Sequence, residues 1–209
     1  IPEIWAHFAT DLMFAENKIN YAIMVQGFYH MNSTNNFINL KKSYEGAKLI
    51  ITTSKYSLSY LNNMFPNLKK KIFKVNLSVD SSKFKIKKKS NLITYLPRKL
   101  PEHSSLLLFY LKNLLPKNWK ILPLINLPEK KMIKSLSISK IFLSFSNFEG
   151  LGIPPIEAAL SGNKVIGYVG GGGSEYWKKP IFTKVENGEI GDFAKKIIKN
   201  IKSYKYGWI

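Results

Sequence analysis

Short apolar runs alternate with helix-like segments along this 209-residue chain, and that alternation constrains its fold more than any other feature. After position 90, strands are expected at Asn91–Leu96, Trp119–Pro123, Lys140–Phe145, Lys164–Val169 and Ile181–Val185. Helices are expected between them, at about Pro101–Leu114, at Pro128–Ser137, after Pro154, and after Gly188 to about Ile201. Strands that alternate with helices pair in parallel and bury both faces of the sheet. The pattern therefore predicts an α/β fold with a Rossmann-like parallel sheet.

The first part of the chain repeats this pattern less completely. Strands are expected at Asn20–Gln26, Lys48–Thr52 and Lys71–Val75, and Ser54 is placed to cap a helix that runs to about Asn63. The polar, basic segment VDSSKFKIKKKSN follows and is typical of an interdomain linker. We therefore predict a partial α/β domain at 1–88 and a Rossmann-like domain at 89–209.

The segment SNFEGLGIPPIEAALSG, from Ser146 to Gly162, combines a glycine loop with a helix start. Glycines let a backbone approach a ligand closely, and prolines favour the first turn of a helix. The N–H groups at a helix N-terminus suit a phosphate, and the carboxylates of Glu149 and Glu157 can accept hydroxyl groups. The alternative is an ordinary turn in which the acids only satisfy the helix dipole, with Glu157 in the first turn.

This order of elements resembles the retaining glycosyltransferases of family 4 and their relatives, which have the GT-B fold. The resemblance implies that Glu149 contacts the donor sugar and that Glu157 holds the ribose hydroxyls of the nucleotide. It implies backbone donors to phosphate and sugar at Gly150, Leu151, Gly152 and Ile153. The residues 91–201 match a donor-binding domain of this family, and the residues 1–88 match only part of its N-terminal domain.

A second glycine-rich loop runs from Gly170 to Glu175, where the resembled family has a related Gly-Gly-x-x-Glu element. Ordering several glycines is costly, which is tolerated where a chain wraps a ligand. We predict that Gly171 and Gly172 line the acceptor side of the site. A flexible loop before a helix capped by Ser174 is the alternative.

Polar residues follow several of the predicted strands directly, at Arg98, Asn126, Glu149 and Gly170. Ligands of parallel sheets lie at the carboxyl ends of strands, so these residues are expected to converge. Arg98 is the only arginine among 32 basic residues. Its planar fork can bind a diphosphate with two charge-assisted hydrogen bonds. We predict that Arg98 and Glu149 are catalytic, and that Lys99 and Asn126 bind the donor.

The identity of a second cation stays open. The resembled family has a lysine about five residues after its arginine, and this chain has His103 at that place. Either Lys99 substitutes for it, or the site uses one cation. In the first part of the chain, His30 follows a strand in VQGFYH and is expected near the acceptor. A hydrogen-bonded structural role is the alternative for His30.

The formal net charge of +19 raises the question of nucleic-acid binding. The near absence of arginine argues against it, because base and phosphate recognition rely on the guanidinium fork. Lys69–Lys71 and Lys85–Lys89 are read as solvated loops, or as segments that attract an anionic membrane surface. Cysteine is absent and no Asp-x-Asp motif occurs, so no metal site and no cofactor are expected.

The resemblance implies an enzyme, a retaining and metal-independent glycosyltransferase. It would move a sugar from a nucleotide-sugar to a surface glycan or lipid-linked acceptor, as in bacterial polysaccharide biosynthesis. A cytoplasmic location, peripheral at the inner face of the membrane, is expected. The chain begins with Ile1 and is read as a fragment, inactive alone if its acceptor part is incomplete. The alternative is a non-catalytic nucleotide-sugar-binding or partner module, and a GT-B epimerase or phosphorylase and a nucleic-acid binder are weaker readings.

Overall fold

A computed structural model describes residues 1–9, 19–33 and 36–204, which form two compact units. The first unit contains Ile1–Ser78 together with the loops Phe148–Leu151 and Gly171–Glu175. The second contains Val79–Asn147, Gly152–Gly170 and the chain from Tyr176 onwards. The division falls after Ser78, so the basic segment that was read as a linker belongs with the second unit.

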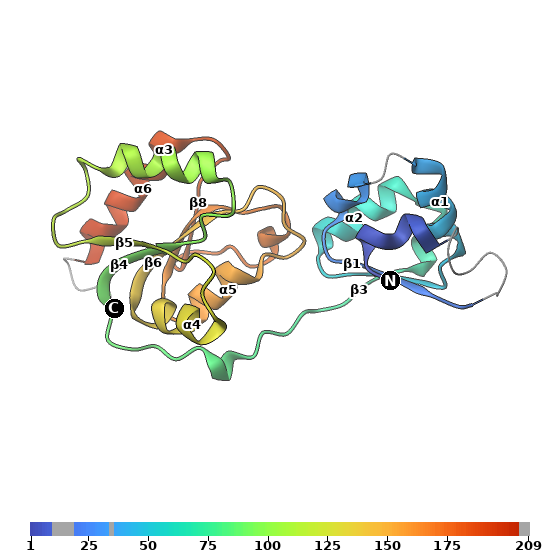
Figure 1. The fold of residues 1–209 in the computed structure, drawn as a ribbon, viewed down its shortest axis with the longest axis horizontal. Coiled ribbons are helices and arrows are strands. Elements are labelled where there is room, and N and C mark those ends of the chain that lie inside the picture. The colour runs from blue at the N-terminus through green and yellow to red at the C-terminus, as the bar shows by residue number, and fades with distance from the viewer. Residues whose placement is uncertain (10–18, 34–35, 205–209) are drawn as a thin grey trace. The chain divides into compact units, whose positions relative to one another are not determined.

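The second unit is built on a five-stranded parallel sheet with the order β5-β4-β6-β7-β8 (Figure 1). Its strands are β4 (Ser90–Tyr95), β5 (Lys120–Pro123), β6 (Ser139–Phe145), β7 (Lys164–Tyr168) and β8 (Phe182–Lys184). In register, Ile93 of β4 lies opposite Ile141 of β6, and Phe145 lies opposite Tyr168 of β7. The predicted Rossmann-like parallel sheet is confirmed.

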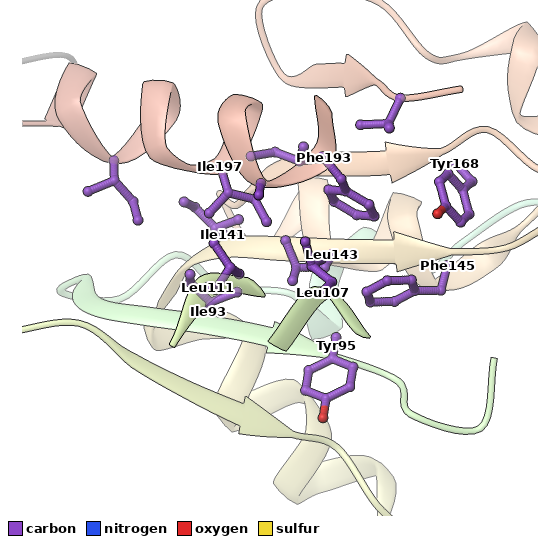
Figure 2. Close-up of a cluster of buried hydrophobic side chains, with 14 of the residues drawn as sticks. Ile93, Tyr95, Leu107, Leu111, Ile141, Leu143, Phe145, Tyr168, Phe193 and Ile197 are labelled. Atoms are coloured by element: carbon purple, nitrogen blue, oxygen red, sulfur yellow. The ribbon is translucent and has the colours of Figure 1, made fainter. Parts of the chain in front are cut away.

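Helices cover both faces of this sheet (Figure 1). Helices α3 (Pro101–Leu111) and α6 (Ile190–Ser203) pack together on one face, and α4 (Glu129–Ile138) and α5 (Ile153–Leu160) cover the other. Successive side chains of a strand point to opposite faces, so β6 must be apolar on both. Its residues Ile141, Leu143 and Phe145 therefore meet α3 and α6 (Figure 2), and Phe142 joins the separate core beneath α4 and α5.

A polar cluster ties the basic segment to the second unit. The Lys89 ammonium donates to the carbonyl oxygens of Leu136, Ser139 and Ser161 at 3.3, 2.8 and 2.5 Å. The Asn163 side-chain amide also donates to Leu136, at 2.8 Å, and to Ala158, at 2.9 Å. Since these carbonyls lie at or near the ends of α4 and α5, the cluster fixes both helices against the start of β6.

The first unit has a three-stranded parallel sheet in the order β1-β2-β3. Its elements are β1 (Ala22–Val25), α1 (Phe37–Gly46), β2 (Leu49–Thr52), α2 (Lys55–Met64) and β3 (Ile72–Lys74). As predicted, the Ser54 side chain caps α2 by accepting a 3.1 Å hydrogen bond from the Ser57 N–H. A separate core that includes Ile23, Ile50 and Tyr44 holds this unit together.

Two local predictions were wrong. Ser174 does not cap a helix, because it lies inside a short 3-10 turn at Gly172–Glu175. Helix α3 ends at Leu111 instead of reaching Leu114. None of the helices in the described ranges combines the length and the apolar character needed to cross a bilayer.

Candidate functional site

In the second sheet, the direction in which successive strands are added reverses between β4 and β6. From β4 the chain passes through α3 to β5 on one side, and from β6 it passes through α5 to β7 on the other. A crevice opens outside the carboxyl ends of strands at such a reversal, and ligands of open α/β sheets bind there. A ligand site is therefore expected at the connections that follow β4 and β6. These connections carry Arg98 and the glycine loop.

Arg98 lies in the turn that follows β4. The Lys99 N–H closes this turn by donating to the Leu96 carbonyl at 3.3 Å, and Leu100 takes a left-handed conformation with φ of 47° before α3 begins at Pro101. The Arg98 side chain is exposed, and no described residue forms an ion pair with it. Lys99 is half-buried and already has an interaction within the structure. Arg98 is thus the better placed of the two to meet an incoming anion.

His103 forms a hydrogen bond within the second unit that could not be predicted from its position in the sequence. Its Nδ1 lies 3.0 Å from the hydroxyl of Tyr168, and the two rings meet edge to face with centroids 5.6 Å apart. Tyr168 ends β7, and burial raises the pKa of its hydroxyl. The pair fastens the first turn of α3 to the sheet, which positions the turn that carries Arg98.

The sequence around the start of α5 limits which backbone N–H groups can donate to a ligand. Gly152 is buried, has a φ of 81° and occupies the N-cap position of α5. Pro154 and Pro155 come directly after Ile153 and have no N–H to donate. In the first turn of α5, only Ile153 and Ile156 therefore have an N–H group. Donation to a phosphate by Ile153 and by the preceding loop stays a prediction.

Tyr176 holds this turn, and the sequence interpretation missed it. Its hydroxyl donates to the Gly152 carbonyl at 2.6 Å. The only local signal was an aromatic residue directly after the second glycine-rich loop, which does not identify the acceptor.

Removing that hydroxyl should loosen the turn. We expect Tyr176→Phe to lower the free energy of unfolding by about 1 kcal/mol, the usual net value of one hydrogen bond. Affinity for a ligand held by the Gly152 turn should fall several-fold. Urea unfolding and calorimetric titration measure the two effects, with Tyr110→Phe on the exposed side of α3 as the control. Equal behaviour of the two variants would show that the bond does not position the turn.

Glu157 lies in the second turn of α5 and is half-buried. Burial raises the pKa of its carboxyl, Glu129 raises it further, and Lys83 lowers it. Lys83 and Glu129 themselves form a 2.9 Å ion pair. The first turn of α5 contains no acid, so the alternative in which Glu157 only satisfies the helix dipole there is wrong. A half-buried carboxylate of raised pKa is suited to accepting hydroxyl groups.

The raised pKa of Glu157 gives a pH test. Hydrogen bonds from hydroxyl groups favour the ionised carboxylate, so the binding of a ribose should lower this pKa. Nucleoside affinity should therefore rise as the pH rises from the ordinary glutamate range through the raised pKa, and then level off. In Glu157→Gln we expect about tenfold weaker binding at neutral pH and no such rise. Titrations across this range check it, and an unchanged pH profile in the variant would remove Glu157 from the site.

The two glycine-rich loops pack backbone to backbone. Glu149 and Gly171 form an isolated parallel bridge, and the Gly172 N–H donates to the Glu149 carbonyl at 3.2 Å. A Cβ on Gly172 would lie 1.7 Å from the carbonyl oxygen of Gly150. The packing of the two loops therefore requires glycine at position 172. This close packing explains one of the glycines whose ordering costs backbone entropy. The Glu149 side chain is half-buried and has a partner within the structure.

The predicted site residues are divided between the units. The second unit holds Arg98, Lys99, Asn126, Gly152, Ile153 and Glu157, and the first holds His30, Glu149, Gly150, Leu151, Gly171 and Gly172. His30 is exposed in a 3-10 turn at Phe28–Ser33. Asn126 is exposed after β5 with a φ of 45°. One cleft lined by all of these residues stays a prediction.

Among residues 1–9, 19–33 and 36–204, no group of three or more His, Asp or Glu side chains is placed to hold a metal ion. Metal independence itself stays a prediction, to be tested with a chelator.

Comparison with known proteins finds similarity in structure but not in sequence. No family model matches the chain, and no curated protein matches it. Among solved structures, HepE of Anabaena in complex with UDP superposes with a TM-score of 0.69 at 12% identity, covering 97% of this chain and 67% of that one. Sucrose-phosphate synthase of Thermosynechococcus elongatus gives 0.67 at 13%, covering 90% and 60%. A variant of S. aureus TarM crystallised with UDP gives 0.67 at 16%, covering 91% and 45%.

These matches concern the fold. The chain spans 45% to 60% of the length of the TarM and sucrose-phosphate synthase chains. Their sequence identities are low, but the matched regions cover 90% to 97% of this chain. The chain therefore has the Rossmann-like α/β architecture of the GT-B glycosyltransferases.

Proposed function

We propose that this chain is the nucleotide-sugar-binding part of a retaining glycosyltransferase that transfers a sugar to a surface glycan or a lipid-linked acceptor in the cytoplasm. One observation carries the proposal. The order of the second sheet reverses between β4 and β6, and the connections that follow these two strands carry Arg98 and the Gly152 turn. An exposed guanidinium and a glycine turn at such a reversal are suited to a diphosphate.

The proposed chemistry breaks the bond between the sugar and the diphosphate. Arg98 and the backbone N–H groups from Gly150 to Ile153 take up the negative charge that develops on the leaving group. Glu157 accepts the ribose hydroxyls and fixes the nucleotide, and Glu149 holds the donor sugar. The acceptor hydroxyl attacks on the side of His30, Gly171 and Gly172. As the new glycosidic bond forms, its proton passes to the oxygen of the departing diphosphate. No metal ion or other cofactor takes part.

The similar structures support a nucleotide ligand. HepE was crystallised with UDP and with UDP-glucose, and starch synthase IV of Arabidopsis thaliana with ADP and acarbose. Calorimetric titration with UDP, GDP, ADP and dTDP, with the corresponding nucleosides as controls, tests the proposal. We expect one diphosphate to bind more tightly than its nucleoside. If no diphosphate binds, the proposal fails.

A non-catalytic nucleotide-sugar-binding module is the second candidate. The observation that favours it is the first unit, whose described sheet has three strands. Hydrolysis of the preferred nucleotide-sugar separates the two candidates. Turnover supports the enzyme, and tight binding without turnover supports the module.

Nucleotide binding should survive removal of divalent metal. A guanidinium and backbone N–H groups would neutralise the diphosphate in place of a metal ion, so we expect the dissociation constant to stay the same within about twofold after EDTA treatment. Titration with and without EDTA, followed by addition of Mg²⁺ or Mn²⁺, measures this. An absolute requirement for either ion would contradict the prediction.

A further inference from the structure

Helix α3 has an apolar stripe on its outer side. Leu107 and Leu111 are buried against the sheet, yet Leu106, Phe109 and Tyr110 are 53%, 76% and 50% exposed. Leu114, just beyond the helix, is 49% exposed. The spacing of i, i+3 and i+4 places Leu106, Phe109 and Tyr110 along one side of the helix. A helix that is apolar on both sides has a second surface to cover, and a contiguous exposed apolar patch marks an interaction site.

Helix α6 places a row of lysines beside this stripe. Its residues Phe193, Ile197 and Ile201 are buried, and its outer side carries Lys195, Lys199 and Lys202. A groove of about 500 Å³ between the two helices is lined by Tyr110, Leu114, Lys195, Ile198, Lys199 and Lys202. The apolar stripe and the lysine row therefore share one surface, which we call the α3–α6 face.

Among the residues that the structure describes, no carboxylate neutralises the charge of this row. Lys196, on the same helix, pairs with Asp192 at 2.7 Å, and Lys184 pairs with Glu186 at 2.8 Å. No carboxylate of the described residues pairs with Lys195, Lys199 or Lys202. The α3–α6 face thus combines exposed aromatic and leucine side chains with three free positive charges.

From this combination we infer that the α3–α6 face docks on the surface of an anionic lipid bilayer. Aromatic and leucine side chains enter the boundary between headgroups and acyl chains, and a flanking row of lysines contacts anionic headgroups. A second copy of the chain fits this face less well. In a symmetric contact the lysine rows of the two copies would lie close together and repel each other. A nucleic acid would leave the apolar stripe uncovered. The inference concerns a face formed by α3 and α6 and does not rest on the proposed nucleotide site.

Two pairs of matched variants test the inference in vesicle co-sedimentation. The vesicles contain phosphatidylcholine and phosphatidylserine, or phosphatidylcholine alone. The charge pair compares Lys195→Ser, Lys199→Ser and Lys202→Ser, made together, with the same triple change at the exposed Lys85, Lys87 and Lys88. The apolar pair compares Leu106→Ser with Phe109→Ser, made together, against Phe73→Ser with Leu77→Ser, which are also exposed but lie in the first unit.

The wild-type chain should bind the anionic vesicles and not the neutral ones. Loss of the three α6 lysines should weaken binding about a hundredfold, since each lysine near an anionic surface contributes about fivefold. The double change on α3 should weaken it at least tenfold. Both control variants should bind within about threefold of the wild-type chain, and all four variants should keep the wild-type nucleotide affinity.

Several outcomes would overturn the inference. Equal losses in the two triple variants would show a diffuse attraction of the whole basic chain. Absence of binding to anionic vesicles would exclude the bilayer. A dimer in solution that the α3 variant dissociates would assign the face to a second copy, and binding of duplex DNA or of an acidic protein that the α6 variant abolishes, without vesicle binding, would assign it to that partner. Failure of nucleotide binding in the wild-type chain would instead bear on the proposed function alone.

Discussion

Replacement of Arg98 by lysine is expected to weaken the binding of nucleoside diphosphates by about ten- to a hundredfold. Lysine keeps the positive charge but loses the planar fork that can donate two parallel hydrogen bonds to a diphosphate. The free nucleoside has no phosphate, so its affinity should hardly change. Because the Arg98 side chain is exposed in the turn after β4, the free energy of unfolding should also stay nearly the same. Calorimetric titration of diphosphate and nucleoside measures the contrast.

The nucleoside serves as the internal control for this variant. Equal losses of diphosphate and nucleoside affinity would give Arg98 a structural role. If neither affinity changed, Arg98 would not be the phosphate cation. Lys99→Ala would then be the next variant, because Lys99 lies in the same turn.

Replacement of Gly167 by alanine is expected to lower the free energy of unfolding by about 3 kcal/mol or more. Gly167 is the fourth of the five residues of β7 and has a φ of 140°, which residues with a side chain rarely adopt. A Cβ there would lie 2.1 Å from the Ser144 carbonyl oxygen and 2.9 Å from the ring of Phe193. The central strand pair and the packing of α6 would both have to shift. Urea unfolding, followed by a probe in the second unit, measures the loss.

Gly191→Ala is the matched control for Gly167→Ala. Gly191 lies in α6, and a Cβ there would meet nothing within 4 Å. Since alanine favours the helix, the control should raise stability by up to about 1 kcal/mol. If Gly167→Ala were as well tolerated as Gly191→Ala, the close packing of β7 against β6 and α6 would be contradicted.

The strands and most helices could be predicted because their signals are local. The strand Lys140–Phe145 and the helix after Pro154 follow from a run of apolar residues and from proline at a helix start, and β6 and α5 lie there. The order of the strands could not be predicted, because it depends on which strands pair. The reversal between β4 and β6, which locates the candidate site, therefore came only from the structure.

The site residues show the same limit. Arg98 was predicted from composition and from its position after a strand, and Gly152 was implied by the resemblance to the glycosyltransferase family. The bond of His103 to Tyr168 and that of Tyr176 to Gly152 join segments far apart in sequence, and no local pattern signals them. Ser174 was misplaced because glycine-rich loops leave the start of a short turn undetermined.

Backbone NMR of the chain titrated with the preferred nucleoside diphosphate tests the central claim most directly. The account predicts large amide shifts in the turn after β4, around Arg98 and Lys99, and in the loop and first turns of α5 from Gly150 to Glu157. The Tyr176 amide should also shift, because its side chain holds the Gly152 turn. Shifts confined to the basic segment Lys85–Lys89, or to the lysine row of α6, would contradict the claim that the reversal between β4 and β6 is the nucleotide site.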